Sequence, residues 1–312
     1  MVGFAALRLP LMCAPMSFAS SVPLAVACRS AGVVAGWQGG TVTPLEQFSA
    51  YLEALNAIPG APAIVNLPAR IATERDGAAK LDLLERHRVP LVLSSVGDPS
   101  ALVARVHGWG GRVIHDVTTM RHAEKALAAG ADGLMLTCAG AGGHTGFLTP
   151  LAFVPAVRRM FDGLLIAAGG IADAAGIAAA LTLGADLACM GTRFIATPES
   201  SVVAGHRAMI VEAGIDSIMV SAAMNGVPAN WMTASVAAAG LDPATLPATR
   251  IAMPVRPWRD IWSAGHSVGL IDDEVPVATL VARLADNLAT RAPGDWRARL
   301  AAIERDWARA AA

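Results

Sequence analysis

The alternation of short apolar runs with helix-like segments most limits what this chain can fold into. Eight such runs occur in the first 190 residues, and each is followed by a segment with helical signals. The runs that we expect to form strands cover residues 11–16, 33–38, 63–67, 91–96, 113–117, 134–136, 164–168 and 187–190. Eight strand–helix units predict an α/β fold of the (β/α)8 TIM-barrel type, with a doubly wound open sheet as the alternative.

Proline and short polar residues stand where several of the intervening helices should begin. Thr43 precedes Pro44, Thr118 and Thr119 follow the fifth strand, and Asp173 follows the seventh. Their side-chain oxygens can accept a hydrogen bond from the first helical turn, and proline suits that turn. We therefore predict helices that begin directly after these positions.

The rhythm changes after the eighth unit, which predicts three regions. Residues 1–199 should form the barrel. Residues 200–260 are Met-rich and lack clear strands, so we expect a smaller helical cap or insertion over the strand ends. Residues 261–312 should supply C-terminal helices that pack back on the barrel.

Composition excludes several classes of function. The net charge of −1 and the even mixture of signs give no sign of a nucleic-acid surface. The apolar first 27 residues lack a preceding charge and are broken by Arg8, Pro10 and Pro15, so no secretory signal is expected. Residues 164–183 are nearly uncharged, but Asp173 and the Gly169-Gly170 pair fit a buried strand, turn and helix better than a membrane span. The four cysteines have no metal-ligand spacing, which favours buried thiols in a reducing cytoplasm.

The loop after the sixth strand is the strongest candidate site. Residues 139–146 read Ala-Gly-Ala-Gly-Gly-His-Thr-Gly, and His144 is the only side chain among them that exchanges a proton near neutral pH. Gly142 and Gly143 let a ligand approach the backbone closely. Because α/β proteins place ligands at strand C-termini, this loop favours a site over an incidental surface turn.

Glycines at the ends of the last two strands indicate an anion site. Ala168 is followed by Gly169 and Gly170, and Gly191 is followed by Thr192. Barrels commonly bind phosphate through backbone N–H groups at these two positions, and Thr192 adds a hydroxyl donor.

Other strand ends offer partners for a flat polar ring. Asn66, and with less support Gln38, could hydrogen-bond such a ring, while Pro15 and Met16 lie at the first strand end. The sequence contains neither a metal-ligand cluster nor a G-x-S-x-G nucleophile elbow. These residues predict a phosphate-bearing cofactor over the barrel mouth, with His144 beside it and no metal.

Residues 139–146 resemble the AGGHxG signature of the nitronate monooxygenases, formerly called 2-nitropropane dioxygenases. Several further segments are similar to the same family, so that the resemblance covers nearly the whole chain. These segments are residues 14–16, 65–67, 167–171, 183–186, 190–194 and 262–265. The resemblance implies a flavin-bearing barrel with a helical cap.

The resemblance also implies which residues hold the cofactor, FMN. Its phosphate would lie near Gly169, Gly170, Gly191 and Thr192, and its ring near Ala14, Met16 and Asn66. The remaining cofactor-binding residues that the resemblance implies are Pro15, Asp116, Gly142, Gly143, Ala168 and Met190.

His144 corresponds to the family histidine that acts as a base or orients the substrate. The implied reaction oxidises a small alkyl nitronate with O₂ to a carbonyl compound and nitrite. If neutral nitroalkanes are accepted, His144 would remove the α-proton. The resemblance leaves open whether the protein forms a homo-oligomer.

One position departs from the family pattern. Many members have a lysine in the fifth strand, where this chain has His115 and Asp116. Asp116 reverses the charge near the flavin, which affects the expected cofactor contacts and substrate class. His115 either replaces part of the lysine's role or is a packed strand histidine.

Two other functions remain open. The same fold and signature belong to flavin-dependent enoyl-acyl-carrier-protein reductases, which consume NAD(P)H and reduce an enoyl thioester. A flavin-binding protein without turnover, for storage or regulation, is a third hypothesis, and the presence of His144 argues against it.

Overall fold

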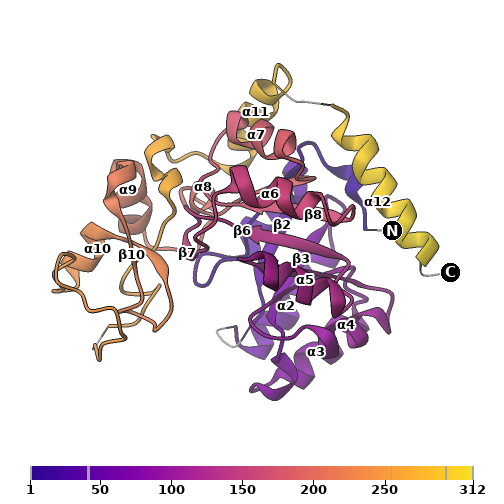
Figure 1. Cartoon of the computed structure of the whole chain (residues 1–312), viewed down its shortest axis with the longest axis horizontal. Helices are drawn as coiled ribbons and strands as arrows, with labels where there is room; N and C mark the ends of the chain where they lie inside the picture. Colours follow the sequence, from indigo (N-terminus) through magenta and orange to yellow (C-terminus); the bar gives the residue numbers. More distant parts are fainter. Residues whose placement is uncertain (1, 41–42, 254, 292–293, 311–312) are drawn as a thin grey trace.

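Eight parallel strands close into a barrel within the described part of the chain. The structure is a computed structural model, and it describes residues 2–40, 43–253, 255–291 and 294–310. Neighbouring strands pair in chain order, and the last pairs with the first (Figure 1). The barrel strands are β1 (Leu11–Cys13), β2 (Val34–Gln38), β3 (Ala63–Pro68), β4 (Leu91–Ser95), β5 (Arg112–Val117), β6 (Gly133–Thr137), β8 (Leu164–Ala168) and β9 (Leu187–Met190). The predicted TIM barrel is confirmed, and the open sheet is excluded.

The strands appear as continuous apolar runs because both of their faces are buried. Side chains alternate between the barrel interior and the layer beneath the helices. Met12 and Ile114 belong to the interior cluster, whereas Leu11 and Val113 pack under the helices. One apolar cluster fills the barrel interior and the other packs under the helices, so both faces of each strand carry apolar side chains.

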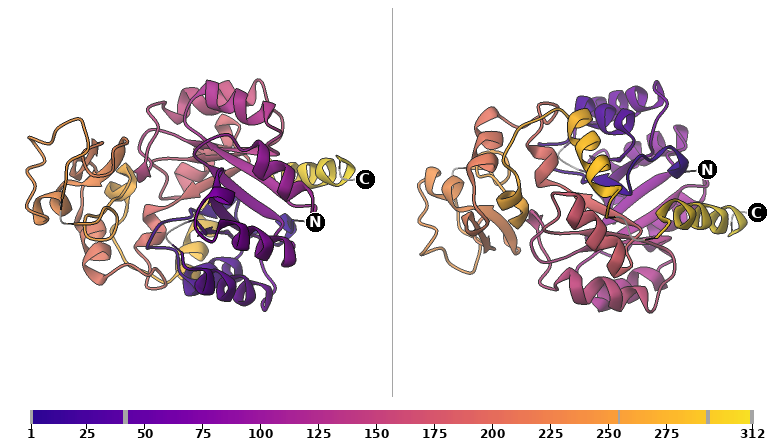
Figure 2. Two further views of the ribbon diagram at one scale, coloured as in Figure 1. Left: turned by 90° about the horizontal axis from the view of Figure 1, so that it is seen from below. Right: turned by 90° about the horizontal axis from the view of Figure 1, so that it is seen from above.

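A ring of helices covers the outside of the barrel (Figure 2). Its last member follows the cap segment in sequence, yet packs between the first and the seventh helix, where it closes the ring. The helices of the ring are α1 (Val22–Ala31), α2 (Leu45–Asn56), α3 (Gly77–Arg86), α4 (Ser100–His107), α5 (Met120–Ala128), α6 (Pro150–Arg158), α7 (Ala174–Leu183) and α11 (Val277–Leu288). The short helix α8 (Thr192–Ile195) directly follows β9.

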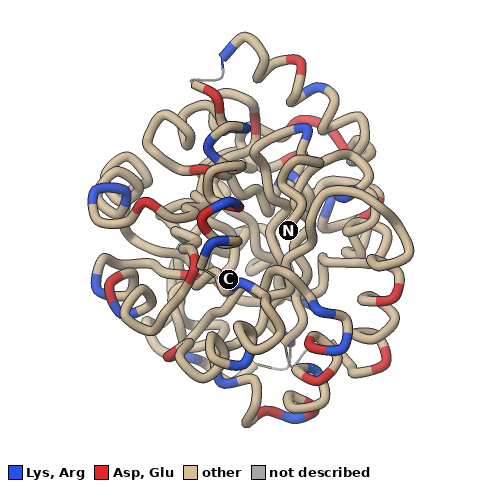
Figure 3. The backbone as a smooth tube through the Cα atoms, turned by 90° about the vertical axis from the view of Figure 1, so that its right-hand side faces the viewer, with Lys and Arg blue, Asp and Glu red and all other residues tan. Residues whose placement is uncertain are grey.

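The C-terminal helix α12 (Trp296–Ala310) packs at the end of the barrel where the chain begins. Leu300 and Ile303 are buried in the same cluster as Phe4 and Leu7. On the face that carries both chain ends, basic and acidic positions are interspersed (Figure 3). This distribution agrees with the even charge pattern of the sequence.

Most helix starts follow the predicted signals. Thr119 accepts a hydrogen bond from the backbone of His122, and Asp173 accepts one from Gly176. Thr43 was expected to cap α2, but the residue at the N-cap position is Pro44. The Thr43 hydroxyl donates to the Gln38 carbonyl at 2.6 Å and so braces the preceding turn instead.

A smaller lobe lies at one side of the barrel (Figures 1 and 2). The sequence predicts this segment as helical without clear strands, and that expectation is wrong in part. Alongside helices α9 (Ala204–Glu212) and α10 (Thr233–Ala238) it contains strands β10 (Ile218–Ser221) and β11 (Ala229–Met232). Strand β11 also pairs with β7 (Gly143–His144), so the candidate histidine belongs to the cap sheet.

Short 3₁₀ helices complete the fold. They are η1 (Phe4–Ala6), η2 (Ile71–Thr73), η3 (Ile215–Ser217) and η4 (His266–Leu270). Among the described residues, no helix has both the length and the apolar character needed to cross a membrane.

Candidate active site

A cavity of about 1630 Å³ lies between the C-terminal ends of the barrel strands and the cap. Most of the residues that the sequence singles out border it, and they converge from the ends of six barrel strands, β1, β3, β5, β6, β8 and β9. They are Ala14, Pro15, Met16, Asn66, Asp116, Gly142, Gly143, His144, Ala168, Gly169, Gly170, Gly191 and Thr192. Val227, Pro228 and Trp258 close the cavity from the cap side.

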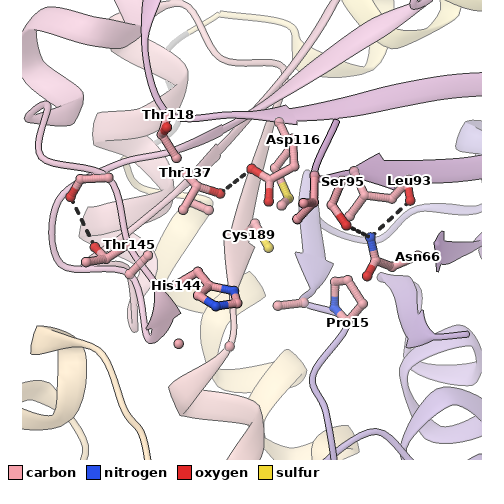
Figure 4. Close-up of a pocket in the computed structure, with 18 of the residues that line it drawn as sticks. Pro15, Asn66, Leu93, Ser95, Asp116, Thr118, Thr137, His144, Thr145 and Cys189 are labelled. Atoms are coloured by element: carbon pink, nitrogen blue, oxygen red, sulfur yellow. Dashed lines mark hydrogen bonds between the residues drawn. The ribbon is translucent and has the colours of Figure 1, made fainter. Parts of the chain in front are cut away.

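Met190 is the one predicted site residue that does not border the cavity. Its side chain is fully buried in the layer between strands and helices. The preceding residue, Cys189, faces the cavity instead (Figure 4). Because successive side chains of a strand point to opposite faces, Cys189 and Met190 cannot both face the cavity.

Unpaired backbone donors line the side of the cavity formed by β8 and β9. No hydrogen bond joins the N–H groups of Gly169, Gly170 or Gly191 to another described residue. Gly170 has φ of +72°, and a Cβ there would meet no atom within 4 Å, so this backbone faces open space. An anion can therefore approach these donors closely.

Thr192 links this donor cradle to the segment that follows the cap. Its buried hydroxyl accepts a hydrogen bond from the Gly265 N–H at 2.9 Å. The hydroxyl proton is then free to donate to a ligand, because the backbone N–H occupies only a lone pair. Thr192 fits the donor role assigned from sequence.

Asn66 presents only its carbonyl oxygen to the cavity. Its amide nitrogen donates to the Leu93 carbonyl at 3.0 Å and to the Ser95 hydroxyl at 3.2 Å (Figure 4). Because both amide protons are used, Asn66 can accept a hydrogen bond from a ring N–H of a ligand. This geometry fits the polar edge of a flat ring.

Asp116 lies inside the barrel mouth and accepts a hydrogen bond from Thr137 at 2.5 Å (Figure 4). Burial raises the pKa of this carboxyl group to about 6, and the Thr137 hydrogen bond opposes that rise. Asp116 can therefore be a neutral donor in mildly acid solution and an anion above it.

His115 points away from Asp116, as strand alternation requires. Its side chain is buried, and its Nδ1 atom has no partner among the described residues. Burial lowers the pKa of His115 to about 4, with a further lowering from His122. Burial fits a packed strand histidine, and His115 also borders the same cavity as Asp116.

His144 is an exposed side chain held by cap residues that the sequence gives no reason to select. Asn225 Nδ2 donates to His144 Nε2 at 3.1 Å, and the Trp258 ring meets the imidazole edge-on at 5.1 Å. His144 also pairs with Ala229 across the β7–β11 ladder. Partial burial lowers the pKa of His144, which favours the neutral imidazole.

Ser263 fixes the loop that carries His144. Its hydroxyl accepts from the Gly143 N–H at 2.7 Å and donates to the Asn230 carbonyl at 2.6 Å. The Asn230 amide in turn donates to the Ala141 carbonyl at 2.7 Å. The segment 262–265 was noted only for its family resemblance, and sequence alone does not show that it touches this loop.

The cavity fits a flavin. The donor cradle suits a phosphate, the Asn66 oxygen suits a ring N–H, and Ala14 and Met16 supply an apolar surface. Within the described ranges, no group of three or more His, Cys, Asp or Glu side chains could hold a metal ion. The fit rests on the arrangement of these partners and on the cavity's size.

Comparison with curated proteins shows relatives that are named as oxidoreductases. A Mycobacterium tuberculosis protein named (3aS,4S,5R,7aS)-5-hydroxy-7a-methyl-1-oxo-octahydro-1H-indene-4-carboxyl-CoA dehydrogenase is 31% identical over 70% of this chain and 61% of its own length. A nitronate monooxygenase of Paraburkholderia phytofirmans is 36% identical over 53% of this chain and 48% of its own length. The chain thus spans about half to three fifths of these curated relatives.

Solved structures match over nearly the full chain. The nitroalkane oxidase of Streptomyces ansochromogenes has a TM-score of 0.79 and 26% identity, covering 92% of this chain and 98% of that one. FabK from Thermotoga maritima has a TM-score of 0.77 and 25% identity, covering 92% and 94%. A match over 92% of this chain includes residues of both the barrel and the cap.

The model of the nitronate monooxygenase family matches residues 61–287, which include β3 to β11 and the loop that carries His144. This match covers more than half of the chain. It agrees with the glycine cradle, the His144 loop and the named relatives. The chain therefore belongs to the nitronate monooxygenase family, a family of flavin-dependent oxidoreductase enzymes.

Proposed function

We propose that this protein is an FMN-dependent oxidoreductase that oxidises alkyl nitronates with O₂ to a carbonyl compound and nitrite. The observation that carries the proposal is the position of His144, which borders the same cavity as the phosphate-type cradle. Family membership and the structural match to a nitroalkane oxidase support it.

The barrel side of the cavity would hold the cofactor. Gly169, Gly170 and Gly191 would donate their free N–H groups to the phosphate, and Thr192 would add its hydroxyl. Asn66 would accept a hydrogen bond from the polar edge of the ring. When bound, FMN supplies the electron transfer from substrate to O₂.

The cap side would bind and orient the substrate. His144 would hydrogen-bond the nitro group, and Trp258 would exclude water from that side of the imidazole. Because no carboxylate forms a hydrogen bond or ion pair with His144 among the described residues, the imidazole carries no permanent positive charge there. Binding of an anionic nitronate would therefore depend on directed hydrogen bonds rather than on a fixed cation.

The test uses the purified protein as isolated. We would record its visible spectrum, identify the released flavin, and mix the protein anaerobically with propyl-2-nitronate. Bleaching, followed by nitrite release when air is admitted, is the expected result. An unbleached flavin would contradict the proposed substrate.

Reduction of an enoyl thioester by NAD(P)H is the second candidate function. It is favoured by the exposed apolar side chains of Val96, Phe147 and Val227, which border the cavity and suit a long acyl substrate. Rapid bleaching by NADH or NADPH, with none by nitronate, would support this function. A flavin that neither reagent reduces would leave the third hypothesis, binding without turnover.

A further inference from the structure

Asn225 contacts the candidate catalytic imidazole from the turn between β10 and β11. Its amide nitrogen lies 3.1 Å from His144 Nε2. Its amide oxygen accepts a hydrogen bond from the Val227 N–H at 3.2 Å. This second bond sets the orientation of the amide, because a flipped Asn225 would turn its NH₂ group against the Val227 N–H.

The orientation of Asn225 determines which nitrogen of His144 bears the proton. An NH₂ group can only donate, so Nε2 must be the acceptor and the proton of a neutral imidazole must lie on Nδ1. No hydrogen bond joins Nδ1 to another described residue, and Nδ1 is not among the buried atoms without a partner. Nδ1 is therefore the ring nitrogen left to meet a substrate.

Neighbouring groups hold the ring in this state. The ladder between β7 and β11 fixes the backbone of His144 opposite Ala229, and Trp258 packs against the ring. Trp258 is itself packed on Trp231, which is fully buried in the cap. The imidazole consequently has little freedom to rotate and exchange the roles of its nitrogens.

We propose that Asn225 is a positioning residue that holds His144 as the Nδ1–H tautomer, so that His144 meets the substrate as a hydrogen-bond donor. The inference rests on the proposed function for its substrate and on the Asn225–His144–Val227 geometry for its mechanism. In this proposal a cap residue, and not a barrel residue, determines whether His144 acts as a hydrogen-bond donor or as a base.

This assignment separates two substrate classes. A nitronate is already ionised, and its negative oxygens accept a hydrogen bond from Nδ1–H without any proton being removed. A neutral nitroalkane must first lose its α-proton to a base, yet Nδ1 has no free lone pair and that of Nε2 is engaged by Asn225. The native enzyme should therefore strongly prefer nitronates to nitroalkanes.

The first test measures the tautomer directly in the flavin-loaded protein. Histidines would be labelled with ¹⁵N, and the ring signals of His144 identified by their loss in His144→Gln. Spectra recorded at alkaline pH, where imidazoles are neutral, distinguish Nδ1–H from Nε2–H. We expect Nδ1–H in the native protein and a mixture of tautomers in Asn225→Ala.

Asn225→Asp is the sharper variant because it keeps the size and the Val227 hydrogen bond but replaces a donor with an acceptor. It should move the proton to Nε2. Asn56→Asp is the matched control, since Asn56 contacts His87 Nδ1 at 2.8 Å, far from the cavity. The control should leave the His144 signals unchanged. Nε2–H in the native protein, or no change in Asn225→Asp, would overturn the proposal.

The second test compares nitroethane with its nitronate. In Asn225→Asp, Nδ1 gains a free lone pair that can take the α-proton from carbon. We expect kcat/KM for nitroethane, relative to its nitronate, to rise at least tenfold, with Asn56→Asp at the native ratio. A shifted tautomer with an unchanged ratio would overturn the role in substrate choice. If neither substrate reacts with any variant, the proposed function fails, while the spectra still decide the tautomer.

Discussion

On the barrel side of the cavity, the hydrogen bonds of Asp116 and Asn66 join neighbouring strands, whereas on the cap side the hydrogen bonds of the His144 loop join distant segments. Asp116 and Thr137 are 21 residues apart, and Asn66 and Leu93 are 27 apart. On the cap side, His144 and Asn225 are 81 residues apart, and Gly143 and Ser263 are 120 apart. The first set follows from the repeat of the barrel, and the second depends on how the cap folds over it.

From this difference we expect the barrel to hold the cofactor and the cap to orient the substrate. A repeated strand–helix unit places donors at predictable strand ends, which suits an invariant ligand such as a cofactor. The cap holds the histidine that would meet the substrate. Variants on the two sides should therefore fail in different ways, and that contrast can be tested.

The largest expected effect is the loss of flavin when the barrel cradle is filled. Gly170→Glu would place a negative side chain where the phosphate is proposed, and it would strain a backbone with φ of +72°. We expect flavin to bind on the order of 10³-fold more weakly, measured by the fluorescence of titrated FMN.

Gly110→Glu is its matched control. Gly110 has φ of +83° and open space around its Cβ position, but it lies outside the cavity. The backbone strain is thus similar and the phosphate is not approached. Equal loss of flavin in both variants would show that strain, and not the proposed site, causes the effect.

On the cap side, removing the imidazole should spare the cofactor. His144→Ala should retain bound flavin and lose turnover of nitronate on the order of 10²-fold, because a directed partner of the substrate is absent. The measurement is steady-state nitrite release together with the flavin spectrum. Unchanged turnover would remove His144 from the proposed catalytic role.

The barrel side was predictable from sequence because strand residues repeat a local pattern. All eight barrel strands were predicted, and Gly170 and Gly191, which were singled out at two strand ends, have backbone N–H groups without a hydrogen-bond partner among the described residues. Met190, which the family resemblance implied as a cofactor-binding residue, does not border the cavity, because a matched segment does not show which of its residues face inward. Cys189 faces the cavity instead.

The cap side could not be predicted in the same way. Strands β10 and β11 have four residues each, too few for alternation to be distinguished from a helical pattern. The contacts of Asn225 and Ser263 with the His144 loop arise only after the chain returns over the barrel. Single polar residues in such a segment carry no local signal of their partners.

Asp116 gives a pH-dependent test of the barrel side. Its folded pKa of about 6 lies above the ordinary 3.8, so the folded state favours the protonated form. Stability from this group is full below about pH 4 and is lost as the pH rises through 6. Relative to wild type, Asp116→Asn should therefore gain up to about 3 kcal/mol in unfolding free energy between pH 4 and pH 8.

Urea unfolding at several pH values would measure this gain. Asp98→Asn is the control of opposite sign, because hydrogen bonds from Ser100 lower the pKa of Asp98. The unfolding free energy of Asp98→Asn relative to wild type should fall, not rise, as increasing pH ionises the Asp98 carboxyl group of the wild type. A pH-independent difference for Asp116→Asn would contradict the raised pKa.

The smallest expected effect concerns the bridge between the cap and the His144 loop. Ser263→Ala removes the acceptor of the Gly143 N–H and the donor to the Asn230 carbonyl, which should cost about 1–2 kcal/mol in unfolding free energy. Because this bridge positions His144, turnover should also fall by a few fold, whereas flavin affinity should not change.

Ser235→Ala separates the two consequences. The Ser235 hydroxyl accepts from the Trp262 N–H at 2.7 Å within the cap and does not contact the His144 loop. A similar loss of stability with native turnover is expected for this variant. If both serine variants lowered turnover equally, the cap would act through its overall stability, and the distinction between a cofactor-holding barrel and a substrate-orienting cap would lose its basis at this contact.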